Sequence, residues 1–168
     1  KHKTHIDFYS RYPETFENIV KKTVDALEYI DTTKYTHVLR TNTSTLFDYN
    51  KLLLQDFPTV NFYAGSFIGA IQGMKPWISG TNIVMSTDIV KYILTNKGIL
   101  FTDKANEDIA LSNLMNKRSY NTLCIKRLDF VDERSKNVPK ALYHKCFIGD
   151  KDIYCFRFKT MDREIGRA

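Results

Sequence analysis

Apolar residues in this chain alternate between two spacings, and this alternation restricts the fold more than any other feature. After Pro13, apolar side chains recur every three or four residues up to Ile30, as in an amphipathic helix. Strands are predicted at 35–39, 60–65, 82–85, 123–125 and 153–158, and helices at 14–30, 52–57, 87–94 and from 103 or 106 to about 117. Strands that alternate with helices predict an α/β fold, with a mixed, mostly parallel central sheet flanked by helices.

The length of 168 residues predicts a single domain, 1–168, that can bury a core without covalent cross-links. No apolar run approaches the roughly 20 residues that cross a bilayer, and the polar start predicts no signal peptide. The three cysteines are an odd number without close spacing, which argues against a disulfide framework and against a four-ligand zinc site. They favour a reducing, cytoplasmic location.

The net charge of +6 comes entirely from the last 52 residues, which hold 13 basic and 7 acidic side chains. A basic region of this kind is either a binding surface for phosphate groups or nucleic acid, or a solvated surface. The 22 aromatic residues lie mostly inside apolar runs, and no RNA-binding signature is present. We therefore expect no nucleic-acid partner.

Small oxygen-bearing side chains follow the predicted strand at 35–39, in the segment 40–45. Many α/β enzymes bind their ligand at such strand ends. Two further polar segments, 77–82 and 106–110, come later in the chain. The order of these three segments favours an enzyme that transfers a sugar.

Four segments resemble those of GT-A glycosyltransferases, in particular the branch of β-1,3-galactosyltransferases and fringe-like enzymes. They are Glu17–Thr23, Val38–Phe47, Ile78–Ser86 and Glu107–Ala110, in the family's order. The Arg-Thr-Asn segment is also similar to glycosyltransferases of large algal viruses. The resemblance implies a GT-A (nucleotide-diphospho-sugar transferase) fold and transfer of a hexose or deoxyhexose from a UDP-sugar to a hydroxyl of a glycan or glycoprotein. For a viral protein, the location would be the host cytoplasm.

The metal-binding acids of that family are replaced in this chain. Its Asp-x-Asp supplies hard oxygen ligands for Mn²⁺ or Mg²⁺, and the matching residues are Asn42 and Ser44. Neither side chain is charged, so a metal site formed by them is weak and a divalent cation would be held largely by the donor diphosphate. Alternatively, Arg40, Arg157 or Lys159 supplies fixed positive charge, or Asn42 and Ser44 only shape a turn.

The resemblance implies that Asp108 is the catalytic base that accepts the proton of the acceptor hydroxyl. Its neighbour Glu107 would contact the donor or acceptor sugar. The structural alternative is that these carboxylates stabilise the first turn of a helix, which is a common arrangement.

The remaining candidates are binding residues. Donor and sugar contacts are predicted for Arg40, Thr41, Asn42, Trp77, Ser79, Gly80 and Thr81, and diphosphate contacts for Arg157, Lys159 and His144. Trp77 is equally compatible with a partly buried core position, and His144 with a solvated loop. Alternation in 156–159 places Phe156 and Phe158 on the core face and the two cations opposite, where a plain exposed strand face is the alternative.

The family normally begins with strands that bind the nucleoside, whereas only about a dozen residues precede the first helix here. The sequence leaves open whether N-terminal strands are missing or the base is held differently. The short start and the replaced acids also suggest a competing function, a catalytically inactive nucleotide- or carbohydrate-binding module.

Overall fold

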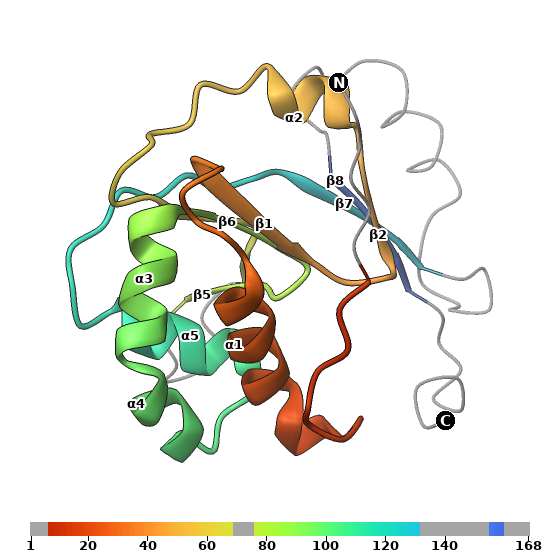
Figure 1. Ribbon diagram of the computed structural model, residues 1–168. Coiled ribbons are helices and arrows are strands. Elements are labelled where there is room, and N and C mark those ends of the chain that lie inside the picture. The colour runs from red at the N-terminus through yellow and green to blue at the C-terminus, as the bar shows by residue number, and fades with distance from the viewer. Residues whose placement is uncertain (1–6, 69–75, 132–154, 160–168) are drawn as a thin grey trace.

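The computed structural model describes residues 7–68, 76–131 and 155–159 (Figure 1). The helices are η1 (Phe16–Asn18, a 3-10 helix), α1 (Ile19–Tyr29), α2 (Tyr49–Leu53), α3 (Thr87–Thr95), α4 (Lys97–Thr102) and α5 (Glu107–Met115). The strands are β1 (His37–Thr41), β2 (Thr45–Phe47), β3 (Tyr63–Ala64), β4 (Phe67–Ile68), β5 (Trp77–Ile78), β6 (Asn82–Ser86), β7 (Arg127–Val131) and β8 (Cys155–Lys159). The mixed α/β class predicted from the sequence is confirmed.

The prediction of one mostly parallel central sheet is wrong for the part of the chain that is described. The strands form three small sheets, ordered β1-β6-β3, β2-β8-β7 and β4-β5. Only β7 and β8 pair in parallel, whereas β6 runs antiparallel to both of its neighbours. β6 lies between β1 and β3 and runs in the direction opposite to both. Antiparallel neighbours do not need the helical crossover that connects adjacent parallel strands.

Four helices, α1, α3, α4 and α5, lie together on one side of the β1-β6-β3 sheet (Figure 1). The apolar stripe predicted for α1 is buried there through Val20, Val24 and Leu27. Ile89, Val90 and Ile93 of α3 are fully buried in the same core. Burial of each such side chain contributes about 1.5–3 kcal/mol, so this core is what holds the helices on the sheet.

A second, smaller core lies on the other side of β6. Its buried members are Phe47, Phe62, Ala64, Val84, Ile125 and Cys155. Side chains alternate along β6, so Ile83 and Met85 join the helical core while Val84 joins the second one. Because Phe47 and Cys155 belong to β2 and β8, this core joins the two three-stranded sheets.

Several predicted element boundaries differ from the structure. The segment 96–98 ends α3 as predicted, but the chain resumes at once as α4. The helix predicted at 52–57 begins earlier, because the side chain of Asp48 accepts a hydrogen bond from the Lys51 N–H (3.2 Å) and caps α2. Residues 123–125 form only an isolated bridge, and β7 occupies the start of the loop predicted at 128–152. Residues 132–154 lie outside the described residues.

The predicted orientation of the last strand is also wrong. Cys155 is buried and Arg157 is half-buried, whereas Phe158 is 45% exposed. The face of β8 that carries Cys155 is the one that packs on the second core, so Arg157 follows it inward and Phe158 turns out. Phe156 is half-buried, and the side chain of Lys159 lies outside the description.

Within the described residues, no helix is long and apolar enough to span a membrane.

Candidate functional site

The three predicted polar segments meet at residues 79–82, which comprise the connection from β5 and the first residue of β6 and are called the loop 79–82 below. Gly80 lies against the end of β1 and the start of α5. A Cβ atom at Gly80 would come within 3.2 Å of Arg40 Nη1, 3.3 Å of Glu107 Oε2 and 3.4 Å of Asp108 Cβ. Glycine thus allows the loop to approach both elements closely.

Arg40 and Glu107 form an ion pair that joins β1 to α5. Their side chains are 19% and 6% exposed, and the Thr23 hydroxyl of α1 donates to Glu107 Oε1 at 2.6 Å. Burial raises the pKa of Glu107, while the positive charge of Arg40 and the hydrogen bond from Thr23 oppose that rise. The carboxylate of Glu107 is therefore held by protein groups, and its predicted contact with a sugar stays a prediction.

Asp108 is half-buried beside the same loop. Its Oδ2 accepts a hydrogen bond from the Gly80 N–H at 3.3 Å, and its Oδ1 accepts from the Ile109 N–H at 3.0 Å. The contact with Ile109 is what a carboxylate makes in the first turn of a helix. A carboxylate offers about four lone-pair directions, of which these two hydrogen bonds use two. This geometry is compatible with both the catalytic and the structural interpretation.

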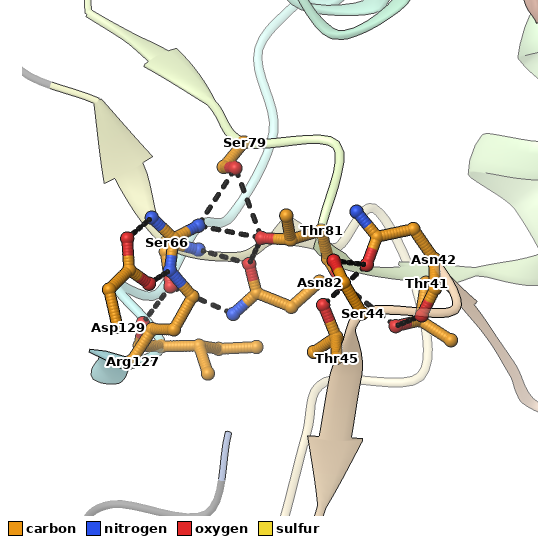
Figure 2. Close-up of polar contacts among 11 residues, drawn as sticks. Thr41, Asn42, Ser44, Thr45, Ser66, Ser79, Thr81, Asn82, Arg127 and Asp129 are labelled. Atoms are coloured by element: carbon orange, nitrogen blue, oxygen red, sulfur yellow. Dashed lines mark hydrogen bonds and ion pairs between the residues drawn. The ribbon is translucent and has the colours of Figure 1, made fainter. Parts of the chain in front are cut away.

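The residues at the replaced metal positions hydrogen-bond to each other. The Asn42 Oδ1 accepts from the hydroxyls of Ser44 (3.0 Å) and Thr45 (2.6 Å), and the Thr45 N–H donates to the Asn42 carbonyl (3.2 Å) (Figure 2). This is a tight turn stabilised by its own side chains. Next to it, the Thr41 hydroxyl donates to the Thr81 carbonyl at 2.9 Å, which joins the turn to the loop 79–82.

Sequence analysis missed Arg127, the first residue of β7. Its Nη1 donates to the hydroxyls of Ser79 (2.8 Å) and Thr81 (2.6 Å), while Nε and Nη2 donate to the Asp129 carboxylate at 2.5 and 3.0 Å (Figure 2). The side chain of Arg127 is only 10% exposed. Ser79 and Thr81 are buried with it, so their predicted contact with a sugar also stays a prediction. An Arg-x-Asp pattern, which places both charges on one face of a strand, was the available signal.

Asn82 accepts a hydrogen bond from the Thr81 hydroxyl and so continues the hydrogen bonds of Arg127 towards β4. The connected residues Arg127, Ser79, Thr81, Asn82 and Ser66 are called the polar layer below. Its Nδ2 donates to the Ser66 hydroxyl (2.8 Å), which in turn donates to the Ile125 carbonyl (2.6 Å). The Ser66 N–H donates to Asn82 Oδ1 at 3.2 Å. All polar atoms in this chain of bonds have partners, so we expect the polar layer to be rigid. It holds the loop 79–82 between the β1-β6-β3 sheet and the β2-β8-β7 sheet.

Arg157 differs from Arg127 because part of its guanidinium lacks a partner. Its Nε is buried without a hydrogen bond from the described residues. Burial lowers the pKa of Arg157, and the positive charge of Arg127 lowers it further, while the carboxylates of Asp129 and Asp108 act in the opposite direction.

The remaining predicted residues are less well defined by the geometry. Trp77 is half-buried in β5, where it pairs with Ile68, so both interpretations of it stay open. His144 lies outside the described residues. For Lys159, only the backbone is described.

Two cavities flank the Arg40–Glu107 ion pair. One, of about 500 Å³, is lined by Arg40, Thr41 and the inner face of α1. The other, of about 280 Å³, is lined by Asn106, Glu107 and residues of α1 and α4. Asp108 lines neither of them, and instead faces the loop 79–82.

In the described ranges, no three His, Cys, Asp or Glu side chains come together as a metal site would require. Comparison with known proteins adds no assignment: no protein-family model and no curated protein matches this sequence.

Proposed function

We propose that this chain is a GT-A-like glycosyltransferase that moves a sugar from a UDP-sugar to a hydroxyl of a glycan or glycoprotein. One observation carries the proposal: the loop 79–82 joins the end of β1 to the start of α5 through Gly80. The four segments that resemble the family thus lie in one region of the fold rather than on four separate surfaces.

In the proposed reaction, Asp108 removes the proton from the acceptor hydroxyl. The acceptor oxygen then attacks the anomeric carbon, the bond from that carbon to the diphosphate breaks, and the nucleoside diphosphate leaves with the electron pair. Negative charge grows on the leaving diphosphate and needs compensation. We assign this role to Arg157, with Lys159 and His144 as further candidates.

Glu107 has a positioning role in this proposal. Its carboxylate binds Arg40 of β1 and holds the guanidinium beside Gly80 of the loop 79–82. The weak metal ligands proposed at Asn42 and Ser44 leave any Mn²⁺ or Mg²⁺ to be bound mainly by the donor diphosphate. Donor or sugar contacts are proposed for Arg40, Thr41, Asn42, Trp77, Ser79, Gly80 and Thr81, and the cytoplasm, of the host for a viral protein, as the location.

A second candidate function is a catalytically inactive nucleotide- or carbohydrate-binding module. The observation that favours it is the turn at Asn42, whose side-chain oxygen is already occupied by the hydroxyls of Ser44 and Thr45. Such a module would bind a donor but would not break its glycosidic bond.

The experiment that separates the two candidates compares binding with turnover. UDP, GDP and CMP, each with and without Mn²⁺, are screened by thermal shift, and a panel of UDP-sugars is assayed for transfer and hydrolysis. Asp108→Asn should retain the thermal shift and lose at least about 10²-fold in turnover, whereas Asp56→Asn, an exposed control, should retain both. Normal transfer by Asp108→Asn would refute the proposed base, and binding without turnover by the unmodified chain would favour the module.

A further inference from the structure

Among the described side chains, the face of the β2-β8-β7 sheet that packs towards the loop 79–82 carries more positive than negative charge. Arg127 and Asp129 lie two residues apart on β7, and Arg157 is the cross-strand partner of Asp129 on β8. Thr45 of β2 is the partner of Arg157 on its other side. Side chains at paired positions share one face of a sheet, so these four groups are neighbours.

Of the side chains that the structure describes on this face, two are guanidinium groups and one, Asp129, is a carboxylate. Asp129 is bound by Arg127 through two hydrogen bonds, in the fork geometry that makes such pairs strong. The buried Nε of Arg157 then has no equivalent partner within the described part of the chain. A buried donor without an acceptor is costly, and a positive charge that is partly removed from water adds to that cost.

Arg127 and Arg157 have different roles in this arrangement. Arg127 is nine-tenths buried, and four of its N–H groups are directed at Asp129, Ser79 and Thr81. It positions the loop and contributes charge. Arg157 is half-buried, so part of its side chain is exposed.

A phosphate group fits these requirements. Its oxygens accept hydrogen bonds from a planar guanidinium, and its negative charge offsets the excess positive charge on this face. The position is also suitable, because Arg127 beside it binds Ser79 and Thr81, the neighbours of Gly80, whose N–H donates to Asp108. A diphosphate bound to Arg157 would lie on the face of the sheet that packs towards the loop 79–82.

We infer that Arg157, with Arg127 behind it, forms a binding site for the phosphate groups of a nucleotide that needs no divalent cation. The inference rests on the proposed function and deepens it, since it assigns the compensation of diphosphate charge to arginine rather than to a metal. It also gives a purpose to Asn42 and Ser44 as turn residues, because the metal that their family counterparts hold is not required.

Binding of sodium pyrophosphate, UDP and uridine to the full chain in EDTA tests this inference. Calorimetry should show pyrophosphate and UDP binding without metal, while uridine, which lacks phosphate, binds more weakly than UDP. Arg157→Gln should weaken pyrophosphate at least about tenfold. Lys91→Gln removes the same charge from the exposed face of α3 and should leave the affinity within about twofold, because solvent and salt screen distant charges.

Arg157→Gln should fold normally, because it removes a buried donor that lacks a partner; a circular dichroism spectrum and melting temperature check this. If it does not fold, Arg157→Lys keeps the positive charge but lacks the paired N–H donors of a guanidinium, and it should still lower the affinity for pyrophosphate. Binding that requires Mn²⁺, or equal loss in Arg157→Gln and Lys91→Gln, would overturn the inference. Pyrophosphate binding in EDTA without any sugar transfer would sustain this site and count against the proposed function, so the two can fail separately.

Discussion

Replacement of Arg40 by glutamine tests the buried ion pair at the centre of the candidate site. Glu107 is the more deeply buried partner, with a side chain 6% exposed against 19% for Arg40. Arg40→Gln leaves the Glu107 carboxylate in a poorly solvated position without its counter-ion. Removal of one partner from a buried pair costs about 3–5 kcal/mol, a large part of the 5–15 kcal/mol that stabilises a typical domain.

The cost should depend strongly on pH. Burial already raises the pKa of Glu107 above its ordinary value of 4.5, and loss of Arg40 raises it further. Between 4.5 and that raised pKa, the folded protein binds more protons than the unfolded chain, so its stability falls as pH rises. Each pH unit in this window lowers the free energy of unfolding by about 1.4 kcal/mol.

Urea denaturation at pH 5, 6 and 7 measures this free energy in the unmodified chain, Arg40→Gln, Glu107→Gln and the double variant. We expect Glu107→Gln to cost less than Arg40→Gln, since the remaining arginine reaches water more easily. The double variant should be more stable than Arg40→Gln at pH 7, because no buried charge remains. A penalty for Arg40→Gln that is the same at pH 5 and pH 7 would show that Glu107 does not carry the cost.

Two further substitutions test close packing around the loop 79–82. Gly65→Ala should lower the free energy of unfolding by about 3 kcal/mol in thermal denaturation, because the new Cβ would lie 2.3 Å from the Asn82 carbonyl oxygen and 2.4 Å from Ile78 Cγ2. Ser112→Ala should cost about 1–3 kcal/mol by the same measurement, because the buried Ile78 N–H loses the hydroxyl that accepts its hydrogen bond at 3.2 Å.

Gly98→Ala is a control for the first substitution, since a Cβ there meets no atom within 4 Å. It should leave stability unchanged or raise it by a few tenths of a kcal/mol, given the helical position of Gly98 in α4. Equal effects of alanine at Gly65 and Gly98 would contradict the close approach described for Gly65. For Ser112, a Ser112→Thr variant as unstable as Ser112→Ala would indicate that volume, rather than the hydroxyl, decides the effect.

Local sequence patterns predicted the helices better than the sheets. The stripe of α1 and the start of α3 at Thr87 follow from the spacing of apolar residues along a few turns. Strand direction does not follow from such a pattern, because an apolar run is the same whether its neighbour is parallel or antiparallel. For this reason β6 was found and its antiparallel pairing was not.

The candidate site was predicted in part for a similar reason. Arg40, Gly80 and Asp108 were each predicted as site residues from segments that resemble one family, and the geometry brings these three together. Arg127 was missed because the hydroxyls that it binds are far away in the sequence: Ser79 lies 48 residues earlier. A charged residue of that kind resembles a surface residue until its partners are known.

The polar layer joins two sheets that share no backbone hydrogen-bond ladder. Arg127 belongs to the β2-β8-β7 sheet, and the hydroxyls that it binds precede β6 of the other sheet. The separation between Arg157 and Asp108 is therefore set by how the sheets dock, through the small core around Phe62 and Val84. A ligand that binds both Arg157 and Asp108 would stabilise the contact between the two sheets. Amide hydrogen exchange should therefore slow on binding mainly at this contact rather than in the helices.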